Sequence, residues 1–171
     1  AANDEKWQLS SATDANGRSV TFSYLSQQIG GQWAVDTATL PNGSVIDYEY
    51  DYRHRLVKTT VWPRDGITLQ TSKTYINNLL FCTTDAYGRS TYRGYRDSDR
   101  RMIRQVKGLR PSFSQGNFNQ VKALVRPADC NAANQAFTIS DMILDVAGQT
   151  IAQIDPRGIV DAIIYDSRGR T

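Results

Sequence analysis

A four-residue turn motif, Asp-x-x-Gly, recurs near the C-terminal end of the chain, and each copy leads into residues that favour β-strands. The copies run from Asp145 to Gly148, from Asp155 to Gly158 and from Asp166 to Gly169. The aspartate supplies a side-chain acceptor to the turn, and glycine adopts positive φ without steric cost. Successive motif glycines are about ten residues apart, which is typical of antiparallel strands joined by tight turns. The motif therefore predicts a series of β-hairpins.

Regularly spaced glycines continue toward the N-terminus. Glycines at positions 43, 66, 88, 108, 148 and 169 are about 20 to 23 residues apart, with one gap near position 128. A period of that size indicates a repeat array with about one hairpin per unit. The alternating residues Val20, Phe22 and Tyr24 after Asn16-Gly17 fit one such hairpin.

The residues around the turns approximate Tyr-Asp-x-x-Gly-Arg-Leu at four places, which are 50–56, 84–90, 95–102 and 165–171. This motif resembles the YD repeat of the Rhs proteins, and the turn from Asp155 to Gly158 is similar to the Asp-Pro-x-Gly turn between such repeats. Two copies depart from the pattern, because His54 and Asp99 stand where the turn glycine is expected. Residues 109 to 135 show no motif.

The resemblance implies an all-β fold, an array of antiparallel β-hairpin repeats with little helix. We expect one repeat domain over residues 1–171, with a motif-free insertion at about 109–135. The residues expected in repeat turns are Gly17, Gly43, Gly88, Asp155, Gly158, Asp166 and Gly169.

The resemblance also implies a structural role, because the strands of many repeats coil into a shell in the larger Rhs proteins. We expect a secreted or cell-surface scaffold, either a wall segment of such a shell or a subunit of a filament. The last motif, from Tyr165 onward, leaves a hairpin without its second strand. Its pairing strand is expected from another copy of the chain or from the rest of a longer repeat polypeptide.

Composition agrees with a β-rich globular protein. Hydrophobic residues make up 40% of the chain and charged residues 22%, and nine tyrosines suit cross-strand pairs. The net charge of +3 arises from 20 basic and 17 acidic residues, so it does not indicate a nucleic-acid partner. The arginine-rich segment from Arg89 to Arg110 is read as repeat arginines that pair with Asp85, Asp97 and Asp99.

The two cysteines, Cys82 and Cys130, have no Cys-x-x-Cys or Cys-His spacing that would fit a zinc site. Two interpretations stay open, a disulfide between them or two buried free thiols. A disulfide is the preferred interpretation, since it would anchor residues 109–135 to the strand at 79–84. No run of 18 apolar residues predicts a membrane span.

The sequence assigns no catalytic residue, no cofactor and no metal site. Its single histidine, His54, lies in a repeat turn without a nucleophile motif nearby. The alternative to a scaffold is a secreted carbohydrate-binding module or glycan-acting enzyme, with Trp33 and Trp62 as sugar contacts. Strand aromatics are more often part of a core, which favours the scaffold.

Overall fold

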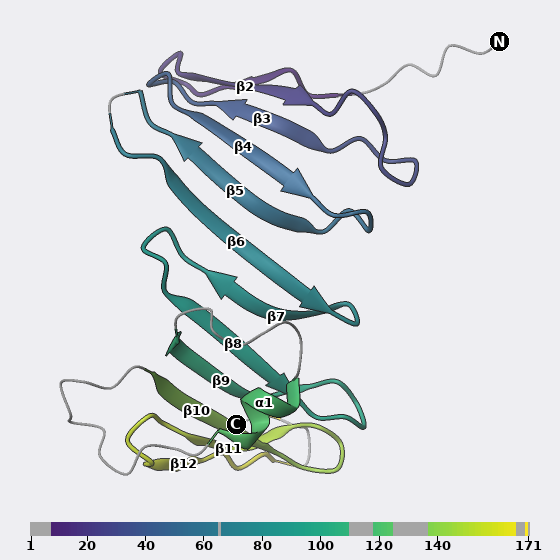
Figure 1. Cartoon of the computed structure of the whole chain (residues 1–171), viewed down its shortest axis with the longest axis vertical. Helices are drawn as coiled ribbons and strands as arrows, with labels where there is room; N and C mark the ends of the chain where they lie inside the picture. The colour runs from purple at the N-terminus through teal and green to yellow at the C-terminus, as the bar shows by residue number, and fades with distance from the viewer. Residues whose placement is uncertain (1–7, 65, 110–117, 125–136, 167–169, 171) are drawn as a thin grey trace. The chain divides into compact units, whose positions relative to one another are not determined.

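The computed structural model describes residues 8–64, 66–109, 118–124, 137–166 and 170. Twelve antiparallel strands form one sheet, in which strands that follow one another in the sequence are neighbours (Figure 1). The strands are β1 (Ser11–Thr13), β2 (Ser19–Tyr24), β3 (Val35–Thr39), β4 (Val45–Tyr50), β5 (Leu56–Trp62), β6 (Leu69–Ile76), β7 (Leu79–Thr84), β8 (Ser90–Tyr95), β9 (Met102–Leu109), β10 (Thr138–Leu144), β11 (Thr150–Ile154) and β12 (Val160–Ala162). The predicted all-β hairpin array with little helix is confirmed.

The chain divides into two compact units, residues 1–72 and 73–171, here called the N-terminal unit and the C-terminal unit. Each unit is a run of hairpins, and each is described by itself. The expectation of one repeat domain over the whole chain stays a prediction.

In the N-terminal unit, strand alternation separates an apolar face from a polar face. The cross-strand partners on the apolar face run from Phe22 to Ala38, then to Ile46, Val61 and Leu69. Ala38 is buried, whereas Phe22, Ile46 and Val61 are half-buried and Leu69 is exposed. The described residues of this unit form no helix.

The opposite face of the N-terminal unit is lined with hydroxyl, amide and carboxylate groups. One row of cross-strand partners joins Ser23, Thr37, Asp47, Thr60 and Gln70 across strands β2 to β6. Because successive side chains of a strand point to opposite faces, this polar row and the apolar row come from adjacent positions in the same strands.

The C-terminal unit has a buried hydrophobic core because a helix covers its sheet. Tyr92, Val106 and Ile139 are cross-strand partners, and all three are fully or nearly fully buried. The helix α1 (Phe118–Ala123) packs on strands β8 and β9 and contributes the buried Val121 (Figure 1). The Phe118 ring packs edge-on against Phe81, so the helix and the strands share one hydrophobic cluster.

Close approach of α1 depends on Gly94 in β8. A methyl group at this position would lie 3.3 Å from Lys122 Cγ and 3.5 Å from Val121 Cγ1. Arg104 then fastens the end of the helix, because its guanidinium donates to the carbonyls of Lys122 and Leu124. The same guanidinium forms a largely buried ion pair with Asp141 in β10.

The motif-free insertion expected at about 109–135 contains the helix α1. The strand before the last motif, β12, covers only Val160–Ala162. The helix needs no turn motif, because a helix this short is stabilised by its packing against the strands.

The structure gives no support to the expected disulfide. Cys82 is a free cysteine, buried in the core cluster, and its sulfur lies 4.0 Å from Thr84 Oγ1. The expected partner, Cys130, lies outside the described residues. Burial of the Cys82 side chain among Phe81, Tyr92 and Val106 is sufficient to explain its presence as a small apolar residue.

Candidate functional site

The repeat turn is built around a single aspartate carboxylate. In the turn from Asp51 to Arg55, one carboxylate oxygen accepts the backbone N–H groups of Arg53 and Arg55, at 2.9 and 3.0 Å. The other oxygen accepts Arg55 Nε at 2.7 Å. The backbone closes the turn, since Asp51 N donates to the Arg55 carbonyl and His54 N donates to the Asp51 carbonyl.

The same arrangement recurs in both units. A carboxylate oxygen accepts the backbone N–H four residues later in the turns that begin at Asp14, Asp85, Asp145, Asp155 and Asp166. Arginine four residues after the aspartate completes an ion pair in three of these, and the pairs are Asp14–Arg18, Asp85–Arg89 and Asp166–Arg170. At Asp155 the paired arginine is Arg157.

Of the turn glycines singled out from the sequence, Gly17, Gly88 and Gly158 lie in these aspartate turns, and Gly43 lies in the turn from Leu40 to Ser44. Gly17, Gly43, Gly88 and Gly158 all have positive φ, between 76° and 87°. Asp155 and Asp166 supply the carboxylates, and Gly169 lies outside the described residues. His54 replaces glycine in its turn and still adopts a φ of 62°. Its ring packs directly on Gly30, where any side chain would collide with it at 2.8 Å.

Hydrogen bonds to these aspartates lower their pKa values. The backbone N–H of Arg18 lowers the pKa of Asp14, and the side chain of Arg55 lowers that of Asp51. The strongest case is Asp99, whose pKa falls to about 2 because the Arg96 side chain binds it and the Arg101 N–H adds to this effect. These carboxylates are ionised structural anchors at neutral pH.

A second recurring contact joins the two strands of four hairpins at the end opposite the turn. The hydroxyl of a tyrosine at or near the end of the second strand donates to a carbonyl 15 residues earlier, on or beside the first strand. The four pairs are Tyr24 to Leu9, Tyr50 to Val35, Tyr95 to Leu80 and Tyr165 to Thr150, at 2.7 to 3.0 Å. Burial raises the pKa of Tyr50 and of Tyr95, which keeps these hydroxyls protonated as donors.

Sequence reasoning identified Tyr50, Tyr95 and Tyr165 as repeat residues and Tyr24 as a strand residue, but it missed the carbonyls that they bind. The partner carbonyl is set by the strand register, which no local motif encodes. The signal available in the sequence was the tyrosine directly before the turn aspartate in Tyr50-Asp51 and Tyr165-Asp166.

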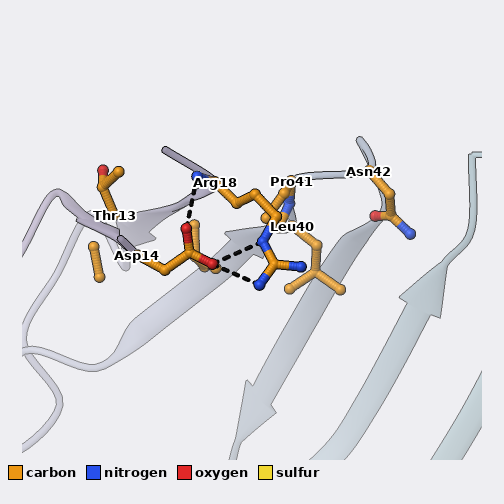
Figure 2. A pocket seen from close by; sticks show the side chains of 8 residues that line it. Thr13, Asp14, Arg18, Leu40, Pro41 and Asn42 are labelled. Atoms are coloured by element: carbon orange, nitrogen blue, oxygen red, sulfur yellow. Dashed lines mark hydrogen bonds and ion pairs between the residues drawn. The ribbon is translucent and has the colours of Figure 1, made fainter. Parts of the chain in front are cut away.

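A hollow lies beside the first turn of the N-terminal unit. It measures about 820 Å³ and lies between the Asp14 to Arg18 turn and the neighbouring turn at Leu40, Pro41 and Asn42. Figure 2 shows that the Asp14 carboxylate binds the Arg18 backbone and guanidinium, so both charged groups face each other. Val20 and Ala12 complete an open, mainly apolar lining with no charge left for a ligand.

The two tryptophans expected to contact glycans are not brought together. Trp33 is half-buried in the loop between β2 and β3, beside a hollow that Phe22 and Tyr24 also line. Trp62 ends β5 opposite Val45, at the other end of the strands, and is 49% exposed. Its indole N–H donates to Asp47 Oδ2, a contact that sequence reasoning missed.

The arginines of the segment 89–110 are largely paired with acids. Arg89 binds Asp85, Arg96 and Arg101 bind Asp99, and Arg104 binds Asp141. In the described part of the chain, no group of three or more histidine, cysteine, aspartate or glutamate side chains is placed to hold a metal ion. The described helix is also too short to span a membrane.

Comparisons with known proteins agree with the fold. No family model matches the chain, and no curated protein matches it. Among solved structures, a chain in the crystal structure of TcdB2-TccC3-Cdc42 is similar, with a TM-score of 0.62 and 12% sequence identity. The match covers 94% of this chain but only 8% of that one. It shows the fold alone, an antiparallel β-sheet similar to a part of that chain.

Proposed function

We propose that the chain is an extracellular structural scaffold, a segment of a β-repeat wall that extends by pairing its edge strand with a strand of a neighbour. The observation that carries this proposal is the repeated hairpin closure, in which the same aspartate turn and the same tyrosine-to-carbonyl bond recur in both units. A repeat of this kind extends a sheet by one hairpin at a time. Its recurring residues stabilise the hairpins.

Strand β12 has the properties of a pairing edge. All three of its residues are exposed, and Val160 is 58% exposed. The N–H of Ile163 donates inward to the Ile151 carbonyl. Antiparallel strands alternate their hydrogen bonds, so the N–H of Ala162 points away from β11. No charged side chain other than Asp161 lies on this strand to discourage pairing.

In the isolated chain, the pairing strand comes from a second copy. The strand at the opposite end of the sheet order is β1, and β2 is its one neighbour among the strands that the structure describes. Pairing of β12 with β1 of the next copy is a head-to-tail contact, and such contacts generate open filaments when they do not close into a ring. A longer polypeptide would supply the same pairing from its own next repeat.

The variant Ala162→Pro tests this proposal. Proline removes the outward N–H while leaving the inward bond of Ile163 in place, and edge strands tolerate proline at such positions. We expect concentration-dependent assembly of the unchanged chain in sedimentation velocity and monomers for Ala162→Pro. The control is Ala162→Gly, which keeps the N–H and should assemble. A chain that is monomeric at every concentration, or an Ala162→Pro variant that assembles normally, would contradict the proposal.

A further inference from the structure

Trp62 presents an aromatic face to solvent on the polar side of the N-terminal unit. Its side chain remains about half exposed, at 49%, while the indole N–H is bound to Asp47. That bond fixes the orientation of the ring, which lowers the entropy lost when a ligand stacks on it. The other highly exposed aromatic of this unit, Tyr52, differs because the guanidinium of Arg53 lies over its ring at 5.3 Å.

Hydrogen-bonding groups lie beside the Trp62 ring on the same face. Thr60 is two residues earlier in β5, and its cross-strand partners are Asp47 on one side and Gln70 on the other. Thr60 is buried, at 6% exposed, whereas Gln70 is exposed. Neighbouring strands are about 4.8 Å apart, which sets these polar groups at regular intervals across the sheet.

The carboxylate at the Trp62 ring disfavours anionic ligands. Asp47 binds the indole N–H directly, and next to it in β4 Glu49 pairs with Lys58 at 2.6 Å, so that pair is neutral overall. Arg64, two residues after Trp62, lies beside the Gly43 turn. A phosphate, sulfate or uronate group placed beside Asp47 would be repelled, whereas neutral hydroxyl groups would find both donors and acceptors.

We propose that Trp62, Asp47 and Gln70 form a binding site for a neutral pyranose oligosaccharide. The apolar face of one sugar ring stacks on the Trp62 indole, and Asp47 accepts hydrogen bonds from its hydroxyls. Gln70, which is exposed, binds the hydroxyls of the next ring, while the buried Thr60 lies between Asp47 and Gln70 in the register of the sheet. Aromatic stacking combined with a few placed polar groups is the usual composition of small-ligand sites. This site is independent of the scaffold role, since it lies on a sheet face and not at an edge strand.

The test uses the full chain and four neutral probes, cellohexaose, xylohexaose, mannohexaose and chitohexaose. Binding is measured by calorimetry and by the NMR shift of the Trp62 indole N–H. We expect at least one probe to bind. Trp62→Ala should lower its affinity about tenfold or more, and Asp47→Asn should lower it less because the amide still accepts the indole bond. Trp62→Tyr, which keeps an aromatic face, should recover part of the loss.

The matched control is Tyr52→Ala, which removes an exposed aromatic ring from a turn of the same unit and should bind as the unchanged chain does. Circular dichroism checks that each variant keeps its β spectrum. Binding of none of the four probes would overturn the proposal. So would equal binding by Trp62→Ala, or tighter binding of an oligogalacturonate or a single-stranded oligonucleotide than of every neutral probe.

Discussion

The carboxylate of the turn aspartate accepts three hydrogen bonds. It accepts two backbone N–H groups that point into the turn and also holds the arginine that follows. In the turns that begin at Asp14, Asp85 and Asp166 the same ion pair is exposed, and exposed pairs contribute little by themselves, about 0–1 kcal/mol. Backbone donors satisfied by a charged acceptor contribute more. The turn is therefore specified mainly by the carboxylate-to-backbone bonds, and the arginine is secondary.

Replacement of the turn aspartate tests this ranking. Asp51→Ala should destabilise the chain by about 1–3 kcal/mol, because two backbone N–H groups lose their acceptor. Arg55→Ala should cost less, because the carboxylate keeps both backbone donors. Urea denaturation monitored by circular dichroism measures both. Equal losses for the two variants would show that the ion pair, and not the backbone capping, holds the turn.

The lowered aspartate pKa values predict acid sensitivity. A carboxylate whose pKa is lower in the folded than in the unfolded chain, where it is about 3.9, stabilises the fold above that value. The stabilisation is lost as the pH falls through the folded pKa, which for Asp99 is about 2. Stability should therefore decline between about pH 4 and pH 2. Denaturant midpoints across this range measure the decline, and Asp99→Asn should make it shallower. A flat profile would contradict the assignment.

The bonds from tyrosine hydroxyls to backbone carbonyls should also stabilise the fold. Tyr50→Phe deletes the bond to the Val35 carbonyl and should cost about 0.5–1.5 kcal/mol. Tyr52→Phe is the matched control, because Tyr52 is 79% exposed and its hydroxyl has no hydrogen-bond partner among the described residues. Thermal or urea unfolding compares the two. A Tyr50→Phe variant as stable as the control would show that the 15-residue bond is incidental.

At the scale of elements, the helix α1 distinguishes the two units. It turns the apolar face of the C-terminal unit into a dry core, in which Val106, Val121 and Ile139 are completely buried. The helix has only six residues, too few to be stable without its packing. Its position thus depends on Gly94, which leaves room for it, and on Arg104, which binds its last carbonyls.

Truncation of the buried helix residue tests this dependence. Val121→Ala should cost about 1–3 kcal/mol, because it leaves a cavity where the side chain was fully buried. It should also raise the hydrogen-exchange rate of the amides of residues 118–123. Gln120→Ala, an exposed change in the same helix, should have little effect. Unchanged exchange in Val121→Ala would show that α1 is held by other contacts.

The hairpins were predictable from the sequence because their signals are local. Asp-x-x-Gly turns and alternating strands need only a few neighbouring residues, and the observed turns at Gly17 and Gly88 follow from them. The helix was not predictable, since its stability comes from Phe81 and Ile139, which are distant in the sequence. The exposure of Trp62 and its bond to Asp47 depend on strand register for the same reason.

At the scale of the whole chain, the apolar row of the N-terminal unit fits the proposed wall segment. Phe22, Ile46 and Val61 share one sheet face and are half-buried. Isolated domains generally bury such a face against another element. This agrees with the proposed wall segment, whose faces and edges are completed by neighbouring repeats.

Edge pairing through β12 is the central claim, and hydrogen exchange at the Ala162 amide tests it most directly. This N–H points away from β11, so it exchanges rapidly unless another strand accepts it. The account predicts that protection of Ala162 rises with protein concentration, while Ile163, already bonded to the Ile151 carbonyl, stays protected throughout. Rapid exchange of Ala162 at every concentration would contradict the account.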